Sequence, residues 1–431
     1  MSKLKTLDYF FEKGFDSVRC KLESKKVSCL LFITSLASTS LSPLYPNSFT
    51  IFFSVDVQKI AYFASGVSPY SSNPWAAPYP PFFFVVWAGV YLFLKSILFE
   101  PASLDLGIRV VSALVVILTS FVIYHAVRTR ESKNFSMSIA AIFLSLACVA
   151  DLLPLNGDSF GLLMVAAASS SFLRSKKSSL GVALLSAGFA FKIHPALALI
   201  LVVTTSFLIS RRLFLKNFTV AFSAIVALFF VPIALIPDAE DVVFSYTANT
   251  LQLYSFSVYS GILDVTDHFE PEIFVSLSQG LNFAFLVSLI ATTAFLCCAL
   301  LRFRIFGSAK PVDVLCLGAM IWLIILKQLL QHYAMWALIP LLVAGRWKSS
   351  FYLITGEIAG SSLWGLGLLH SLHMPLTVSP DPLSSLLFFS GGMIFTFFDL
   401  LAIRKLLQEI RAESLEEKRS LVSYQRIQFS N

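Results

Sequence analysis

Long apolar runs separated by short polar segments dominate the chain after its first 26 residues. A bilayer core about 30 Å thick needs about 20 mostly apolar residues for one helix to cross it. Runs of roughly this length lie near residues 27–44, 108–127, 137–153, 159–173, 217–236, 279–301, 311–327, 351–369 and 384–402. The pattern predicts an all-α, polytopic membrane helical bundle with the lipid bilayer as its partner.

Two further regions complete the predicted bundle. Residues 180–209 form one apolar stretch that Lys192-Ile193-His194-Pro195 interrupts. Because Pro195 lacks an N–H and its ring clashes with the preceding turn, we expect two short helices that meet there and return the chain to its starting side. A short apolar run at 334–345 adds one more crossing, so the expected total is about twelve spans.

Composition favours a membrane protein and argues against a nucleic-acid-binding one. Hydrophobic residues make up 57% of the 431 positions and charged residues 13%, about half the share in soluble domains. The net charge of +7 would suit nucleic acid, but the basic residues lie in short clusters between apolar runs, as in cytoplasmic loops. The six cysteines have no metal-ligand spacing and are expected to be packing residues.

The distribution of Lys and Arg predicts the orientation in the membrane. If 80–98 lies on the outer surface as a juxtamembrane helix, 27 of the 32 Lys and Arg face the cytoplasm, whereas 11 do if it spans. The positive-inside rule favours the first arrangement. It predicts a cytoplasmic tail (1–26), a transmembrane domain (27–403) with a long first extracytoplasmic loop, and a second cytoplasmic tail (404–431). The alternative, in which 80–98 spans and another run does not, stays open.

Five basic residues do not follow this sorting: Lys59, Lys95, Arg109, Lys192 and Lys327. Ionisable groups near apolar helices are costly and often functional. Lys192 and Lys327 are expected at the outer ends of spans, near His194 and His332, where they would form a cationic rim. The alternative for the lysines is snorkelling toward headgroup phosphates. Arg109 would, on the simplest reading, anchor the start of its helix.

Other candidate residues lie in the predicted outer loops. Asp56 is the one acidic residue between Glu23 and Glu100. A lone carboxylate in an aromatic loop is either a helix cap or a partly desolvated base, and the residues alone leave both open. The loop at 237–278 is rich in tyrosine, amide and hydroxyl groups, which suit a sugar or an interfacial aromatic belt.

Five short motifs follow one another between residues 50 and 345. They are Asp56 with Gly66-Val67-Ser68-Pro69-Tyr70 and Tyr79-Pro80-Pro81, Leu155-Asn156-Gly157-Asp158, Phe191-Lys192-Ile193-His194-Pro195, Ser255-Phe256-Ser257-Val258-Tyr259, and Gln331-His332-Tyr333-Ala334-Met335-Trp336. In this order they resemble the membrane-embedded glycosyltransferases of the C superfamily (GT-C). The likeness is greatest to polyprenyl-phosphate-mannose-dependent mannosyltransferases and to the catalytic subunit that adds the first mannose to GPI anchors. Ser54 departs from the paired Asp-x-Asp of many relatives, which weakens the case for a metal.

The resemblance implies a GT-C-like fold and an inverting, mannosyltransferase-like sugar transfer on the extracytoplasmic face. It implies that Asp56 is the catalytic base. The residues implied to bind the donor phosphate are Lys192, His194, Lys327 and His332. Those implied to bind sugar or acceptor are Tyr70, Tyr79, Asp158, Ser257, Tyr259, Gln331, Tyr333 and Trp336.

The implied donor is a polyprenyl- or dolichyl-phosphate sugar, and the acceptor is a glycan, glycolipid or glycoprotein. The resemblance is compatible with a small accessory membrane subunit. No cofactor is expected, and a divalent metal is not indicated.

The lean outer loops without disulfide pairs favour a plasma membrane, or the ER membrane if the protein is eukaryotic. A lipid-linked-saccharide flippase or transporter is the main alternative, because transporters also contain broken helices. A non-catalytic scaffold subunit would leave the ordered motifs unexplained.

Overall fold

The computed structural model is all-helical over the residues that it describes, with fifteen α-helices and no strand there. The described residues are 2–44, 50–70, 79–98, 100–149, 158–175, 179–234, 280, 284, 287–299, 310–325, 333–371 and 382–429. The α-helices are α1 (Ser2–Leu22), α2 (Lys25–Leu41), α3 (Thr50–Ala64), α4 (Pro81–Lys95), α5 (Pro101–Arg128), α6 (Lys133–Val149), α7 (Ser159–Arg174), α8 (Ser179–Phe191), α9 (Ala196–Ile209), α10 (Arg211–Ile225), α11 (Val231–Ala234), α15 (Pro311–Ile325), α16 (Ala334–Ala344), α17 (Trp347–Ser371) and α18 (Pro382–Phe429). The described elements also include a 3-10 helix, η1 (Ser42–Leu44), a π-helix, η3 (Val226–Phe230), and an unlabelled helical segment, Val287–Ala299.

Within the described part of the chain, four helical segments are long and apolar enough to cross a membrane: Lys25–Leu44, Ala102–Arg128, Arg211–Ala234 and Pro382–Glu413. Most other apolar helices are shorter, and α16 has only 11 residues. At 1.5 Å per residue, α16 rises about 16 Å, roughly half a bilayer core. Helices of this length begin or end inside a bilayer, so their ends need partners within the protein.

The predicted break in the apolar stretch 180–209 is confirmed. Helix α8 ends at Phe191 and α9 begins at Ala196, with Pro195 in the N-cap position. Proline is favourable at the start of a helix, where its missing N–H would have had no intrahelical acceptor. The break therefore places Lys192 and His194 in a turn between two helix ends.

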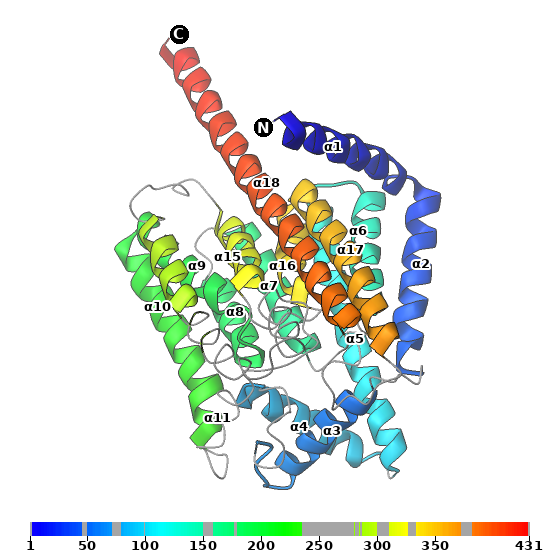
Figure 1. Ribbon diagram of the computed structural model, residues 1–431. Helices are drawn as coiled ribbons and strands as arrows, with labels where there is room; N and C mark the ends of the chain where they lie inside the picture. The colour runs from blue at the N-terminus through cyan, green and yellow to red at the C-terminus, as the bar shows by residue number, and fades with distance from the viewer. Residues whose placement is uncertain are drawn as a thin grey trace.

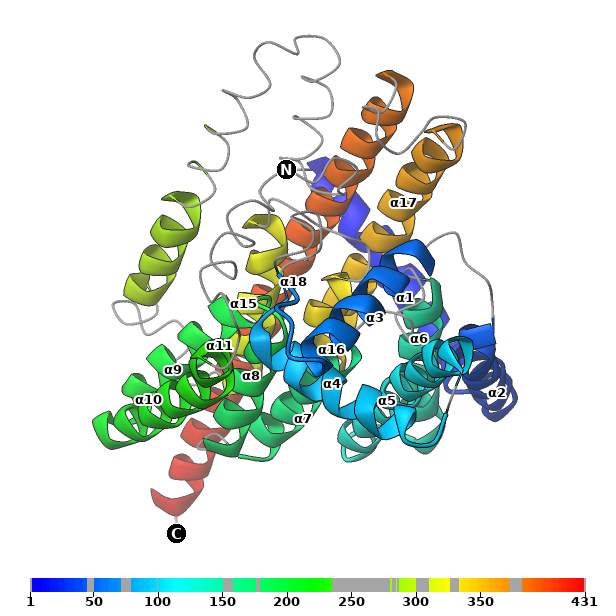
Figure 2. The ribbon, with the colours of Figure 1, turned by 90° about the horizontal axis from the view of Figure 1, so that it is seen from below.

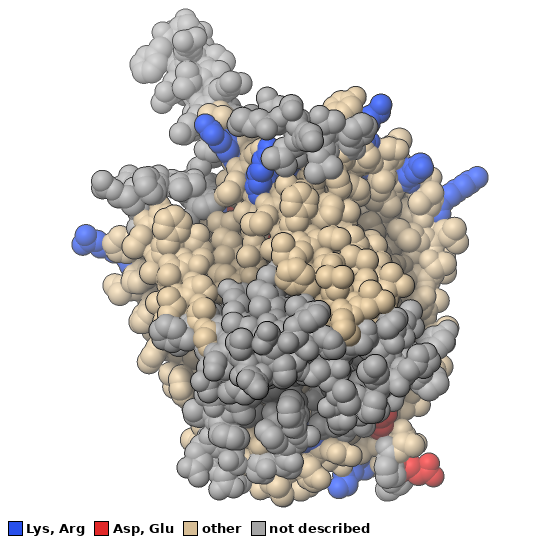
Figure 3. Space-filling view, in the orientation of Figure 1, with Lys and Arg blue, Asp and Glu red and all other residues tan. Residues whose placement is uncertain are grey.

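The two ends of the bundle differ in what covers them (Figure 1, Figure 2). Helix α1 lies across one end, here called the α1 end, and the C-terminal part of α18 extends from the same end. Helices α3 and α4 lie across the opposite end, here called the α4 end. The 15-residue α4 makes up most of the run 80–98, for which a surface helix is predicted. Figure 3 shows Lys and Arg gathered toward the α1 end on the face in view.

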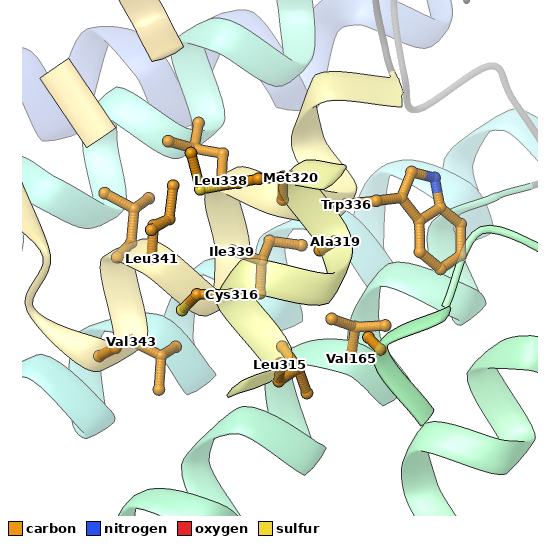
Figure 4. Close-up of a cluster of buried hydrophobic side chains, with 14 of the residues drawn as sticks. Val165, Leu315, Cys316, Ala319, Met320, Trp336, Leu338, Ile339, Leu341 and Val343 are labelled. Carbon is orange, nitrogen blue, oxygen red and sulfur yellow. The ribbon is translucent and has the colours of Figure 1, made fainter. Parts of the chain in front are cut away.

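A dense apolar core joins α5, α6, α7, α9, α15 and α16. Figure 4 shows the part where Leu315, Cys316 and Met320 of α15 meet Leu338 and Ile339 of α16. The closest backbone approach is made at Gly318, where an added Cβ would lie 2.6 Å from the Ala198 Cα of α9. The absence of a side chain at Gly318 lets α9 and α15 pack this closely.

Buried ion pairs tie the helices together at the α1 end. Arg346 is 4% exposed and pairs with Asp313 of α15 at 2.7 Å and with Glu413 of α18. Arg130 donates to the carbonyls of Val343 and Ala344, which are the last in α16. A guanidinium is well suited to the negative end of a helix dipole. These pairings anchor the C-terminal end of α16, and the sequence patterns did not predict them.

Gly318→Ala is expected to lower the thermal unfolding temperature in detergent micelles. The new methyl would overlap the Ala198 backbone, and overpacking of this kind costs about 1–3 kcal/mol. Gly365→Ala in α17 is the matched control, because a Cβ there meets nothing within 4 Å. A Gly318→Ala protein as stable as the Gly365→Ala protein would contradict the close α9–α15 packing.

Candidate functional site

A buried ion pair joins two of the predicted motifs. The Lys192 Nζ lies 2.6 Å from the Asp158 Oδ2, and the two side chains are 10% and 0% exposed. Asp158 is the N-cap residue of α7, and Lys192 directly follows the last residue of α8. Burying two charges is costly unless their geometry is good, so this pair constrains where the ends of α7 and α8 lie.

Two tyrosine rings flank the Lys192 ammonium group. Its Nζ lies 4.5 Å from the centroid of the Tyr333 ring and 5.2 Å from that of Tyr79. At these distances the faces of aromatic rings attract a cation. Tyr79 in turn stacks on Phe83 of α4, with 3.9 Å between ring centroids. The start of α4 is therefore connected to the ion pair.

Tyr70 holds Tyr79 in position through a hydrogen bond. Its hydroxyl donates to the Tyr79 carbonyl at 2.7 Å, and both side chains are buried. Burial raises the pKa of the Tyr70 phenol well above its ordinary value, so the group stays a neutral hydrogen-bond donor. Tyr70 thus supports the site through Tyr79.

His194 occupies the turn between α8 and α9 and is 7% exposed. Its ring packs against Tyr333 edge to face, with 4.1 Å between centroids, and lies 5.5 Å from the Trp336 ring. Tyr333 is the N-cap residue of α16, and Trp336 is in its first turn. Figure 4 places Trp336 at the edge of the apolar core. The site therefore borders the core directly.

Helix ends converge on this site from four directions. Helices α7, α9 and α16 begin there, after Asp158, Pro195 and Tyr333, and α8 ends there. Helix N-termini carry partial positive charge and attract anions. With Lys192 and His194 beside them, the three N-termini give the site a cationic character. The site is buried within the bundle, because the exposed fractions of Asp158, Lys192 and His194 are 1%, 8% and 7%.

Gly161 and Ser112 hold the surrounding helices in place. A Cβ at Gly161 would lie 2.5 Å from the Trp336 ring, so only glycine lets α16 pack this closely on α7. The Ser112 hydroxyl of α5 donates to the Ser159 hydroxyl at 3.1 Å, next to Asp158. Neither residue was predicted. The sequence does not distinguish a glycine or serine that makes a helix contact from any other in an apolar helix, because the contact depends on which helices are neighbours.

The structure brings together seven of the predicted site residues: Tyr70, Tyr79, Asp158, Lys192, His194, Tyr333 and Trp336. Asp56 lies in α3, but its side chain is outside the described residues, as are Ser257, Tyr259, Lys327, Gln331 and His332. Lys192 is buried on Asp158 instead of reaching toward headgroups. Among the described residues, no group of three or more His, Cys, Asp or Glu is placed to hold a metal ion.

No protein-family model matches the chain, and no curated protein or solved structure matches it either.

Lys192→Met is expected to lower the thermal unfolding temperature strongly. It leaves the Asp158 carboxylate buried without its ammonium partner, and breaking a buried pair in this way costs about 3–5 kcal/mol. Adding Asp158→Asn should restore part of the loss, because the stranded charge is removed. The readout is thermal unfolding of the single and double variants in micelles.

Lys95→Met is the matched control. Lys95 is an exposed lysine at the end of α4, near the ring of Tyr91. Equal effects of the two Lys→Met changes would show that Lys192 and Asp158 are not energetically coupled.

Proposed function

We propose that this chain is a GT-C-like membrane glycosyltransferase with about twelve spans and both termini in the cytoplasm. It moves a sugar, with mannose the expected one, from a polyprenyl- or dolichyl-phosphate donor to an acceptor hydroxyl on the extracytoplasmic face. The observation that carries this proposal is the recessed cationic site, in which Lys192 and His194 meet three helix N-termini beside Tyr79, Tyr333 and Trp336.

The leaving group explains why such a site needs cations. When the bond between the anomeric carbon and the lipid phosphate oxygen breaks, the phosphate gains negative charge. Fixed positive groups that meet this charge lower the barrier, more so where water is excluded. Lys192 and His194, at 8% and 7% exposure, are suited to this role. Asp158 would hold Lys192 charged and directed at the phosphate.

The recessed position suits a lipid-linked donor. A polyprenyl chain lies among the apolar helices, and the phosphate at its end reaches the short helices α8, α9 and α16 from within the membrane. In this proposal the C–H face of the sugar packs against the aromatic side chains Tyr79 and Trp336, which border Lys192 and His194. The soluble acceptor group approaches from the α4 end.

Asp56 completes the proposed chemistry as the general base. Its carboxylate takes the proton of the acceptor hydroxyl while that oxygen attacks the anomeric carbon from the side opposite the phosphate. The new glycosidic bond forms as the bond to the lipid phosphate breaks, so the configuration inverts. Asp56 is assigned from its motif, and its helix α3 packs on α4, where Phe83 stacks on Tyr79.

Asp56→Asn is expected to reduce sugar transfer by about 100-fold or more, the usual range for loss of a general base. The assay measures transfer from a labelled polyprenyl-phosphate mannose to an alkyl glycoside in proteoliposomes. Asp16→Asn, on the exposed surface of α1, is the control and should transfer at the wild-type rate. Undiminished transfer by a correctly inserted Asp56→Asn protein would rule out the base assignment.

The same assay separates the enzyme from a flippase. The break at Pro195 is also typical of transporters, whose discontinuous helices surround the substrate. A flippase would move the labelled lipid between leaflets and form no new glycosidic bond. Transfer of label to the alkyl glycoside decides for the enzyme.

A further inference from the structure

A second cationic position lies beside the ion pair, on α5. Asp105, Arg109 and Ser112 are four and three residues apart and therefore share one face of the helix. Arg109 is 7% exposed and Ser112 is 0% exposed, so this face points into the protein. The Arg109 Nη2 lies 2.8 Å from the Asp105 Oδ2, whose side chain is 32% exposed. Along α5, these three residues run from the α4 end of the bundle toward its interior.

A hydrogen bond and an apolar cluster relate Arg109 to the site. Ser112 bonds to Ser159, the residue after Asp158. Arg109 is one helical turn from Ser112, about 4.5 Å along the α5 axis toward the α4 end. Its neighbour Ile108 belongs to the same apolar cluster as Tyr79 and Phe191. The Tyr79 ring lies near the Lys192 ammonium group, and Phe191 directly precedes Lys192 in the chain. Arg109 therefore lies one helical turn from the hydrogen bond that joins α5 to the start of α7, next to Asp158.

The basic residues at this end differ in burial: Lys59 of α3 is 3% exposed and Arg109 is 7% exposed, whereas Lys95 lies on the surface. Lys95 is exposed and lies near the ring of Tyr91, as a residue that anchors a helix at the interface would. Arg109 keeps its guanidinium inside the protein, where an ion is costly to hold. A guanidinium is the side chain best shaped to bind a phosphate or carboxylate through two parallel hydrogen bonds.

We propose that Arg109 binds an anionic group of the acceptor, a phosphate or a carboxylate, and so gives the enzyme a preference for acidic acceptors. The inference rests on the proposed function and names the substrate class of its second subsite. Asp105 orients the guanidinium from the more exposed side, and Ser112 fixes α5 against the start of α7.

The test compares three acceptors with the same ring and alkyl aglycone: an alkyl glucoside, the same glucoside carrying a phosphate ester on its aglycone, and the alkyl glucuronide, in which a carboxylate replaces the C6 hydroxymethyl group. Wild-type protein should use the phosphorylated or carboxylated acceptor with a kcat/KM about tenfold or more above that of the neutral one. The better of the two charged acceptors identifies the anion. Equal use of all three would overturn the proposal.

Arg109→Gln should remove this preference through a higher KM for the charged acceptor, and Arg109→Lys should retain part of it. The loss in kcat/KM should be about tenfold or more larger for the charged acceptor than for the neutral glucoside. An equal loss on charged and neutral acceptors would mean that Arg109 has a structural role only, which overturns the proposal. Arg174→Gln, at the exposed end of α7, is the control.

A binding measurement separates this inference from the proposed function. Calorimetric titration of the phosphorylated glucoside into the detergent-purified protein needs no turnover. If no acceptor is glycosylated but Arg109→Gln weakens this binding about tenfold or more, the proposed function fails and the anion subsite stands. If transfer occurs and binding is the same in both proteins, the subsite fails alone.

Discussion

The cost of keeping the Lys192 ammonium and the Asp158 carboxylate away from water is the constraint on which the centre of this protein depends. An ion pair with a fully buried carboxylate is stable only when its partners are held in place. That requirement explains why α7 begins and α8 ends at the same point. It also explains why Tyr79 and Tyr333 enclose the ammonium, and why Gly161 leaves room for Trp336.

The two ends of α16 are held by different contacts. Polar contacts at the α1 end hold its C-terminal end, and the residues around the Lys192–Asp158 ion pair hold its start. Arg130 and Arg346 fix its C-terminal end, and the contacts of Tyr333 and Trp336 fix the start. Helix α1 is attached at the α1 end of the bundle through Glu12, which accepts hydrogen bonds from Lys405 and Lys348. These hydrogen bonds hold the pKa of Glu12 below its ordinary value. Between the two ends the contacts are apolar, as in the α9–α15 packing at Gly318.

Short helices give the site its position. A helix that spans the bilayer would place its ends at the membrane surface, where only a water-soluble ligand would meet them. Helices α8, α9 and α16 have 13, 14 and 11 residues, so the ends that meet at Lys192 lie within the bundle. In the function proposed above, a lipid-linked donor reaches this place from the membrane and a polar acceptor reaches it from the α4 end.

The sequence by itself determined the all-helical class, the break at Pro195 and the helical run after Pro80, because hydropathy and proline geometry act over a few neighbouring residues. It also selected Asp158, Lys192 and Tyr333 as candidates from separate motifs. It did not determine that Asp158 and Lys192 form an ion pair, since they are 34 residues apart and each motif also fits a turn or a surface lysine. The depth of the site, the fit of Gly161 to Trp336 and the burial of Arg109 and Arg346 depend on which helices become neighbours. Only the tertiary structure decides these, because close packing and burial are properties of pairs of helices and not of any single apolar run.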